Sequence, residues 1–498
     1  MVAGVAPSSV PLIPTNGASS SSKGPFPKRK LILNAFDCIV PSHNVPGTWR
    51  GEKGEGHKRF DTLDYWIETA KLLEKGKFHG IFIADSYGFL DIYQGNLDAS
   101  LRGGFQIPKL DPMLIAAVMA SVTTNLALGL TQSTTYEPPF ALARRFTTLD
   151  HISNGRAAWN IVTSVLPSAA RNFGLKEAIE HDKRYEIADE YMDVVYKLWE
   201  SSWHDDAVKR DAISGTWTDP TLVRPINHSS PHFPDIPGPF ISHPSRQRTP
   251  ALYQAGSSGA GTTFGAKHAE AVFIAQPTPK VAALKVAEYR KKVEEAGRDP
   301  RSLKVLPQLL VFLGKTEEEA EENYKYWHSY GDGEVALAFY AGFTGVDWAQ
   351  WGPDEELTPE VGSAGHAFLE NWKRMKPEIK VWTREVFKRE ITISRAGAVA
   401  IGTPAKVADI MEEWITVGDI DGFNLTHFAR NESFEDIVNL LIPELQSRGL
   451  FHTDYDAVPQ PTDASRPIGV TAREGLLGVV GHPHLDPSHH GHQFKWIS

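Results

Sequence analysis

The chain reads LALGLT from Leu126 to Thr131, PPFALARRFTTL from Pro138 to Leu149 and RAAWNIVTS from Arg156 to Ser164. The first and third stretches are largely apolar without strict alternation, as expected of parallel strands that are buried on both faces. The middle stretch has prolines at its start, where a helix tolerates them because its first N–H groups have no intrahelical partner. Residues 126–164 therefore predict a strand–helix–strand unit of a parallel sheet.

The same alternation repeats on both sides of this unit. Six more strands are predicted, at residues 31–36, 81–85, 251–256, 271–276, 303–313 and 422–428. Helices are predicted at residues 61–76, 110–122, 181–203, 262–269, 280–296, 404–417 and 434–446. Eight strands, each followed by a helix, favour an α/β fold of the (β/α)8 TIM-barrel class over a doubly wound sheet.

Segments that depart from the repeat define the expected domain organisation. Residues 1–29 are rich in Pro, Ser and Gly and predict a disordered tail. Residues 30–455 predict the barrel, with insertions at about 204–250 and 316–400; insertions of this size usually shape an active site. Residues 456–498 predict a C-terminal tail that is disordered or lightly docked. We expect no metal site there, because the tail histidines lack a carboxylate frame. They are His482, His484, His489, His490 and His492.

The composition excludes several classes of function. The 498 residues include 51 Lys and Arg and 61 Asp and Glu, and the net charge of −10 argues against nucleic-acid binding. The single cysteine, Cys38, excludes an internal disulfide and favours a reducing, cytoplasmic location. No apolar run reaches the roughly 18 residues of a transmembrane helix, so we expect no membrane partner.

Polar side chains end several predicted strands, where barrel enzymes gather their catalytic and binding residues. Asp85 ends one strand and Thr131 another, although such groups can also simply cap loops. The loop from Ala255 to Gly261, with Ser257 and Ser258, precedes a helix and suits a phosphate bound by backbone N–H groups. An ordinary tight loop is the alternative.

His181 and Tyr185 open the predicted helix 181–203 and lie four residues apart, on one helical face. They could hold a phosphate or the edge of a flavin there, and a polar helix N-terminus without a ligand is the alternative. The sequence has neither a Gly-x-Gly-x-x-Gly fingerprint nor a P-loop lysine, which argues against a Rossmann dinucleotide site and an NTPase.

Six short motifs follow one another between residues 82 and 258. They are FIAD from Phe82, STTYEPP from Ser133, ARRFTTLDHISNGR from Ala143, AWNIVTS from Ala158, HDKRY from His181 and QAGSS from Gln254. In this order they resemble the flavin-dependent monooxygenases of the bacterial-luciferase superfamily, and more narrowly the nitrilotriacetate and dibenzothiophene-sulfone monooxygenase family. The resemblance covers residues 30–455 and implies a (β/α)8 barrel with long insertions and FMN as the cofactor.

The resemblance also implies a reaction and its partners. Reduced FMN, supplied by a separate NAD(P)H-dependent flavin reductase, would react with O₂ to oxygenate a small organic substrate, with nitrogen- and sulfur-containing compounds as candidates. Because members of this family often form dimers or tetramers, the resemblance also implies a homodimer or homotetramer. The cofactor-binding residues that it implies are Asp85 and Thr131 at the isoalloxazine ring, and His181, Tyr185, Ser257 and Ser258 at the phosphate.

The remaining site residues concern catalysis and the substrate. Asn160 and Ser164 end the fourth strand and would complete the flavin pocket. Phe36 and Phe82 would form the apolar side of the substrate cavity. His43, in the loop after the first strand, is expected to be a general acid/base or a substrate contact. The insertion at 316–400 would close over the barrel and exclude water.

Two alternatives stay open. One is a deazaflavin-dependent oxidoreductase on the same superfamily barrel, and the other is a non-catalytic barrel that binds flavin. The loop from Gly47 to Lys53 departs from the family's usual basic, histidine-containing version, so the identity of the substrate stays open as well.

Overall fold

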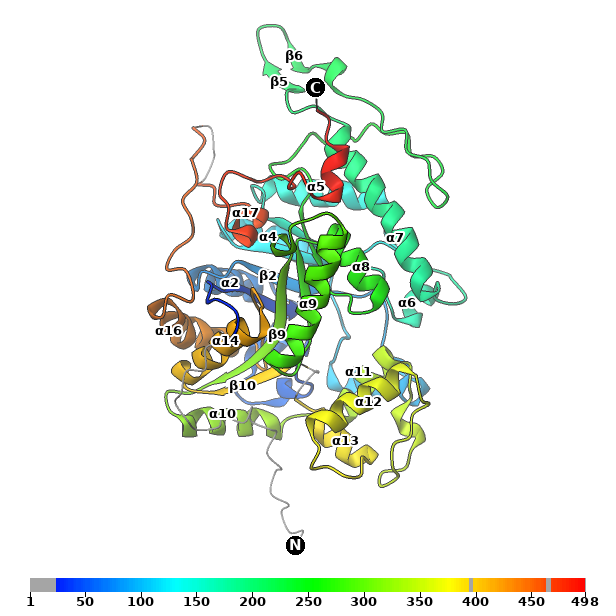
Figure 1. The fold of residues 1–498 in the computed structure, drawn as a ribbon, viewed down its shortest axis with the longest axis vertical. Helices are drawn as coiled ribbons and strands as arrows, with labels where there is room; N and C mark the ends of the chain where they lie inside the picture. The colour runs from blue at the N-terminus through cyan, green and yellow to red at the C-terminus, as the bar shows by residue number, and fades with distance from the viewer. Residues whose placement is uncertain (1–23, 394–396, 463–466, 498) are drawn as a thin grey trace.

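The structure, a computed structural model, describes residues 24–393, 397–462 and 467–497 and is built around a closed ring of parallel strands (Figure 1). The ring runs β1-β2-β3-β4-β7-β8-β9-β11, and β11 pairs with β1 to close it. The strands are β1 Ile32–Cys38, β2 Gly80–Ala84, β3 Ala127–Ser133, β4 Ala157–Val162, β7 Ala251–Gln254, β8 Ala271–Ile274, β9 Lys304–Leu313 and β11 Gly422–Thr426. The fold is therefore the predicted (β/α)8 TIM barrel.

One further strand, β10 Ala398–Gly402, pairs with β9 in parallel, with Ala398 opposite Leu309. The sequence analysis missed it, because its five residues follow a long helical insertion and no clear turn or periodic pattern marks them as a separate strand. All eight strands of the ring coincide with strands that the sequence predicts.

Helices cover the outside of the ring, and side-chain caps begin several of them. Asp111, Ser258, Thr278 and Thr403 each accept a hydrogen bond from a backbone N–H in the first turn of the helix that follows. The covering helices are α2 Leu63–Lys75, α4 Pro112–Val122, α5 Pro139–Ile152, α7 His181–Tyr196, α8 Gly259–His268, α9 Pro279–Glu295, α14 Pro404–Gly418, α15 Glu432–Asp436 and α16 Ile442–Ser447. None of the described helices combines the length and the apolarity needed to cross a membrane.

Short elements fill the loops. They are α1 Glu55–Lys58, α3 Asp98–Gly103 and α6 Pro167–Asn172, with 3-10 turns η1 Thr48–Arg50, η2 Tyr93–Gly95, η4 Pro220–Leu222 and η5 Pro300–Ser302. Two π-helical segments, η3 Lys197–Ser201 and η7 Ile437–Leu441, continue α7 and join α15 to α16.

The long insertion forms a cap with its own core. The insertion begins with α10 Glu317–Ser329, which packs against β9 and β10, and the cap consists of α11 Gly333–Thr344, η6 Trp348–Gln350, α12 Ala364–Met375 and α13 Arg384–Glu390. Trp348, Trp382 and Phe387 are buried in this core, which also takes in Leu90 and Phe105 from the loop after β2. Helices α11, α12 and α13 gather at one end of the molecule (Figure 1).

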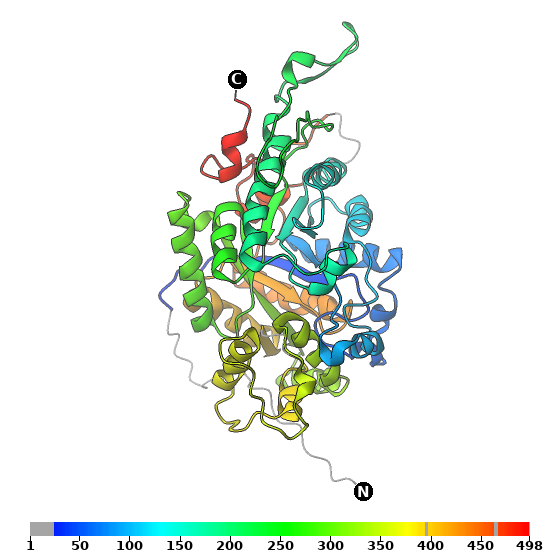
Figure 2. The same cartoon turned by 90° about the vertical axis from the view of Figure 1, so that its right-hand side faces the viewer.

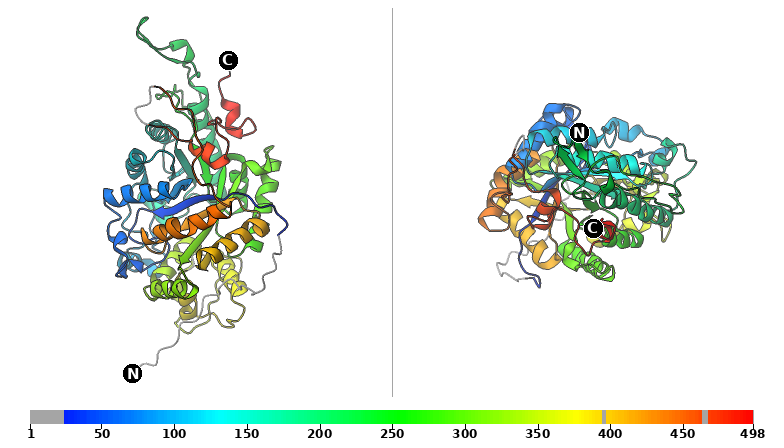
Figure 3. Two further views of the ribbon diagram at one scale, coloured as in Figure 1. Left: turned by 90° about the vertical axis from the view of Figure 1, so that its left-hand side faces the viewer. Right: turned by 90° about the horizontal axis from the view of Figure 1, so that it is seen from above.

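The second insertion lies at the opposite end. Strands β5 Val208–Asp211 and β6 Thr216–Thr218 form an antiparallel hairpin there. Figure 2 and the left panel of Figure 3 show this hairpin and the C-terminal segment at the same end, away from the cap. The insertion at 316–400, and not the one at 204–250, therefore lies at the end of the barrel where its helix α12 covers the strand ends.

Side chains alternate between the interior of the ring and the helical shell. Leu33 and Ala35 of β1 belong to the core shared with the helices, whereas Ile32 and Phe36 belong to the cluster inside the ring. This alternation is what brings every second residue of each strand toward one central space.

The described part of the N-terminal tail contacts the barrel. Residues 1–23 lie outside the described residues, and residues 24–29 contact the end of α14: Phe26 N donates to Thr416 O at 3.0 Å, and Arg29 pairs with Asp419. These contacts correct the expectation of disorder for residues 24–29.

The described part of the C-terminal tail is docked by buried groups. Helix α17 Ala472–Leu477 places Arg473 in a buried pair with Glu270, with Nε 2.6 Å from Oε1. In the last turn, η8 His490–Phe494, the His489 ring bonds to the carbonyl oxygen of His268 at 2.9 Å. The sequence analysis underrated this segment because its anchors are single polar residues and not an apolar stripe.

Candidate active site

A cavity of about 260 Å³ opens at the carboxyl ends of β2, β4 and β7. Asp85 follows β2, Ser164 follows β4, and Tyr185 reaches the cavity from α7. The end of β7 contributes Gln254 and Gly256. Three residues that the sequence predicts for the flavin pocket thus line one cavity, although they come from distant parts of the chain.

The Asp85 side chain is largely shielded from solvent. Its side chain is 12% exposed, and its Oδ1 lies 3.9 Å from the Nζ of Lys109. Burial raises the pKa of Asp85 to about 6, and the Lys109 charge opposes this only in part. A carboxyl group with such a pKa populates both protonation states near neutral pH. Asp85 can therefore donate or accept a hydrogen bond at the edge of this cavity.

The hydroxyl of Tyr185 lies over the turn between β7 and α8. A Cβ atom on Gly256 would come within 2.7 Å of this hydroxyl, and one on Gly261 within 2.8 Å, so glycine is needed at both positions. Ser258 caps α8 by accepting a hydrogen bond from Gly261 N at 3.1 Å. The His181 ring meets Tyr185 edge-on, with 5.3 Å between the ring centroids. These residues form one continuous polar patch, the α8 cradle.

The α8 cradle has the chemistry of an anion site. The 10-residue helix α8 begins here, and its free N–H groups and dipole favour a negative charge. Lys285 of α9 lies at the edge of the cradle: its Nζ donates to the carbonyl oxygen of Ser257 at 2.9 Å and also pairs with Glu288 at 3.0 Å. His181 and Ser257 are both exposed. The cradle can therefore hold a phosphate group that enters from the cavity mouth.

Thr131 and Asn160 are opposite each other on β3 and β4 and lie inside the ring. Asn160 Nδ2 donates to Thr131 Oγ1 at 2.8 Å, and both residues are buried. Asn160 Oδ1 has no hydrogen-bond partner among the described residues, and the same holds for Gln254 Oε1. Such buried acceptors are expected to meet a ligand or a bound water. Gln254 was not singled out as a site residue, although the motif QAGSS begins with it.

Ser164 sits at the rim of the smaller cavity with an unusual backbone. Its φ is 55°, in the left-handed region that non-glycine residues rarely occupy, and its Oγ donates to Ser133 Oγ at 2.9 Å. Strain of this kind is more frequent at functional sites than elsewhere. The chain turns here, just after β4, and Ser164 lines the cavity.

A larger cavity, of about 800 Å³, adjoins the first, and Ala255 lines both. Phe36 and Phe82 line this one, as does Ser257, which does not line the smaller cavity. Trp372 of α12 lies over it, so the cap insertion covers the carboxyl ends of the strands. The geometry supplies two neighbouring compartments at the mouth of the barrel, and apolar surface makes up most of the lining of both.

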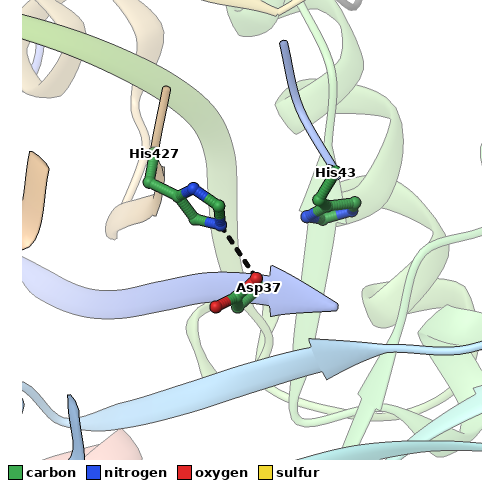
Figure 4. Close-up of side chains that lie close together, drawn as sticks. All are labelled: Asp37, His43 and His427. Carbon is green, nitrogen blue, oxygen red and sulfur yellow. Dashed lines mark hydrogen bonds and ion pairs between the residues drawn. The ribbon is translucent and has the colours of Figure 1, made fainter. Parts of the chain in front are cut away.

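His43 lies in the loop after β1 and belongs to a buried group that the sequence analysis did not assemble. Its ring packs edge-on against Phe36, with 4.7 Å between the centroids. One nitrogen of His43, one of His427 and a carboxylate oxygen of Asp37 all lie within 4.8 Å of one another. Figure 4 shows the two histidine rings on either side of the Asp37 carboxylate. The available signal was an acidic residue at a strand end, as for Asp85.

Asp37 is the centre of an ion-pair network. Its Oδ1 accepts hydrogen bonds from His427 Nε2 at 2.8 Å, from Arg430 Nη2 at 2.9 Å and from Cys38 N at 2.7 Å. Burial alone would raise the pKa of Asp37, but the charges of Arg430 and His427 outweigh it and hold the pKa below its usual value. Two histidines and a carboxylate have the ligand types of a metal site, but the Arg430 guanidinium already occupies the carboxylate and would repel a cation. The network is better suited to fixing the orientation of the histidine rings.

A third cavity, of about 460 Å³, lies at the other end of the ring, beside α17. None of the site residues that the sequence predicts lines it. The chemistry therefore belongs to the end covered by the cap.

Known proteins resemble this chain over most of its length. Residues 38–419 match the family described as luciferase-like monooxygenase. The chain is 42% identical to the dimethyl-sulfide monooxygenase of Hyphomicrobium sulfonivorans over 86% of this chain and 88% of that protein. It is also 42% identical to the long-chain alkane monooxygenase of Geobacillus thermodenitrificans, over 86% and 92% of the two chains.

The comparisons also support the resemblance to nitrilotriacetate monooxygenase and the barrel fold. The nitrilotriacetate monooxygenase component A of Aminobacter aminovorans is 34% identical over 82% of this chain and 91% of its own. The crystal structure of DmoA from Hyphomicrobium sulfonivorans superposes with a TM-score of 0.86 at 40% identity, covering 94% of this chain and 96% of that one. The chain belongs to the luciferase-like monooxygenase family and is a monooxygenase, an oxidoreductase that acts with O₂.

Proposed function

We propose that this chain is the oxygenase component of a two-component, FMN-dependent monooxygenase. Reduced FMN and O₂ would convert an organic substrate to its monooxygenated product, with oxidised FMN and one water as the other products. The two electrons come from reduced FMN, and one atom of O₂ enters the substrate while the other leaves in water. The observation that carries the proposal is the α8 cradle, a phosphate-type site that opens toward a large apolar compartment.

Residues of the smaller cavity and of the adjoining α8 cradle and ring interior fit FMN. The α8 cradle offers the phosphate a helix N-terminus, the Tyr185 hydroxyl, the His181 ring and Ser258. Glycine at 256 lets the Gln254 amide and the Tyr185 hydroxyl lie against the backbone of this turn, since an added Cβ would fall 2.2 Å and 2.7 Å from them. Asp85 and the unsatisfied acceptors of Asn160 and Gln254 can bond the polar edge of an isoalloxazine ring. FMN, when bound, supplies the activation of O₂ and the electrons.

The chain's own residues would bind and orient the substrate and would keep water away from it. Helix α12 covers the larger cavity, and Phe36 and Phe82 line its wall, which limits hydrolytic and wasteful side reactions. We assign to His43 the role of general acid/base, because its imidazole lies against Phe36 beside that cavity. Asp37, through His427, positions this group of rings without itself touching the substrate.

The source of reduced FMN is part of the proposal. A relative named as component A of nitrilotriacetate monooxygenase supports a separate partner protein, an NAD(P)H-dependent flavin reductase, that delivers reduced FMN to this chain. A deazaflavin cofactor remains the competing assignment, and a barrel that binds flavin without turnover is the other.

The test combines the purified chain with FMN, NADH, a flavin reductase from another source and ¹⁸O₂, over a panel of sulfides, amines and aromatic compounds. We expect one ¹⁸O atom per product molecule, only when both the chain and FMN are present. Binding of a reduced deazaflavin in preference to reduced FMN would replace the cofactor assignment. Tight FMN binding with only hydrogen peroxide as product for every compound would favour the non-catalytic barrel.

A further inference from the structure

Lys109 lies beside the aspartate at the edge of the smaller cavity, although none of the sequence motifs contains it. It belongs to the loop between α3 and α4, and its side chain is 13% exposed. Its Nζ is 3.9 Å from Asp85 Oδ1, and it is the one cation within 4.0 Å of that carboxylate among the described residues. Charges that are shielded from solvent to this degree are screened far less than charges on the surface. The Lys109 charge therefore bears directly on the Asp85 carboxylate.

Neutral acceptors fix the position of the Lys109 ammonium. Its Nζ donates to Ser86 Oγ at 2.9 Å and to Gln106 Oε1 at 3.3 Å. Because neither acceptor carries a charge, they hold the ammonium in place without neutralising it. Ser86 lines the smaller cavity with Asp85, whereas Lys109 lines neither that cavity nor the larger one. The lysine is thus placed to act through Asp85 and not by direct contact with a ligand.

Burial is the main reason that the pKa of Asp85 is raised, and two acidic groups add to it. Asp111 caps α4 in the same loop as Lys109, and Glu137 precedes α5. Arg145 pairs with Glu137 and takes up part of that negative charge. Among the effects that lower the pKa of Asp85, the charge of Lys109 is the largest.

Two further titratable side chains near Asp85 carry no charge at neutral pH. Burial raises the pKa of the Cys38 thiol at the end of β1 to about 11, and burial also raises the pKa of the Tyr87 phenol. The backbone N–H of Ser86 favours the ionised Asp85, but less than Lys109 does. Lys109 is thus the side chain that contributes most to keeping Asp85 ionised.

The charge state of Asp85 sets the kind of hydrogen bond that it can make. An ionised carboxylate is an acceptor only, whereas its protonated form also donates. The isoalloxazine ring of FMN carries one N–H donor between two carbonyl groups at its polar edge, and an ionised carboxylate suits the N–H. This step rests on the proposed function, in which that ring occupies the smaller cavity.

We propose that Lys109 is a positioning residue that keeps Asp85 ionised at neutral pH, so that Asp85 accepts a hydrogen bond from the ring N–H of FMN. Lys109 does not itself contact the cofactor. Its replacement by a neutral side chain leaves Asp85 buried without its cation, and such a carboxyl group binds its proton more tightly. The defect is then one of charge state and not of shape, so it depends on pH.

FMN affinity at two pH values tests this on the full chain, by the quenching of flavin fluorescence. Lys109→Met keeps the aliphatic stem and removes the charge, so the pKa of Asp85 should rise from about 6 by about one pH unit or more. We expect the dissociation constant of FMN, relative to the wild type, to be about fivefold higher at pH 6 and unchanged at pH 9. The FMN phosphate titrates in the same range, but it does so in both proteins, so the ratio isolates Asp85. An equal loss at both pH values, or none at either, would overturn the proposal.

Further variants separate charge from structure. Lys109→Arg keeps the cation and should bind FMN like the wild type at both pH values. Asp85→Asn cannot ionise but keeps an acceptor oxygen, so adding Lys109→Met to it should change FMN affinity by less than twofold. Lys71→Met, which removes an exposed lysine of α2, is the matched control. A fivefold loss from Lys109→Met in the Asp85→Asn background would show that the lysine acts without Asp85.

Thermal unfolding without flavin separates this inference from the proposed function. The difference in melting temperature between a chain and its Asp85→Asn variant should level off near pH 6 in the wild-type background and about one pH unit higher in Lys109→Met. This shift without any FMN binding would refute the cofactor assignment and keep the coupling of Lys109 to Asp85. FMN binding without the shift would refute the role of Lys109 and keep the cofactor.

Discussion

His427 Nε2 donates a hydrogen bond to Asp37 Oδ1 at 2.8 Å, across 390 positions of sequence. Asp37 belongs to β1 and His427 follows β11, the two strands that close the ring. Both side chains are buried, and Arg430 joins the same carboxylate oxygen at 2.9 Å. The contact therefore ties together the two ends of the barrel sheet beside the loop that carries His43.

Removal of Arg430 should destabilise the fold strongly. In Arg430→Met the Asp37 carboxylate keeps its burial but loses its guanidinium partner, and breaking a buried pair in this way costs about 3–5 kcal/mol of unfolding free energy. Urea denaturation measures the loss. Arg59→Met, which removes an exposed pair with Glu68, is the control and should change the midpoint little. Equal midpoints for both variants would show that the buried network stabilises the fold no more than an exposed ion pair does.

Asp85 should make stability depend on pH in a defined window. Its folded-state pKa of about 6 lies above the unfolded value, so between roughly pH 4 and 6 the unfolded chain releases a proton that the folded chain retains. The wild type should therefore lose stability relative to Asp85→Asn as the pH rises through this window, by roughly 1–3 kcal/mol, with a constant difference above it. Thermal midpoints of the two proteins at several pH values test this, and parallel curves would contradict it.

The glycine at 256 should matter for flavin binding, and the glycine at 259 should not. A Cβ at Gly256 would lie 2.2 Å from Gln254 Nε2 and 2.7 Å from the Tyr185 hydroxyl, whereas a Cβ at Gly259 would meet nothing within 4 Å. We expect Gly256→Ala to weaken FMN binding at least tenfold, or about 1.4 kcal/mol, with Gly259→Ala unchanged. Flavin fluorescence titration distinguishes the two. Equal affinities would place the phosphate elsewhere than in the α8 cradle.

His43 should affect turnover but not cofactor binding. If its imidazole is the general acid/base, His43→Gln should lower substrate oxygenation by about 10²–10⁴-fold and leave FMN affinity within twofold. His328→Gln on α10, which lines neither the smaller nor the larger cavity, is the matched control. Product formation under steady-state conditions, together with an FMN titration, measures both quantities. Normal turnover in His43→Gln would remove the histidine from the mechanism.

Much of the fold was accessible from local pattern. Apolar runs predict the eight strands of the ring. Prolines at helix starts and capping residues such as Ser258 and Thr403 predict the helices between them. The insertion at 316–400 was also visible as a break in the repeat. Strand β10 and the docking of Arg473 onto Glu270 were not, because a five-residue strand and a single buried ion pair leave no periodic trace.

The candidate site divides in the same way. Sequence alone placed Asp85, Thr131 and Asn160 at strand ends and the Gly/Ser loop before a helix, because these are properties of a few consecutive residues. Only the tertiary structure separated two cavities, put Ser257 on the larger one, and brought His427 to Asp37. The reason is physical: closure of the ring sets β1 beside β11, and the distance between their side chains depends on the register of two strands nearly 400 residues apart. No local pattern encodes that register.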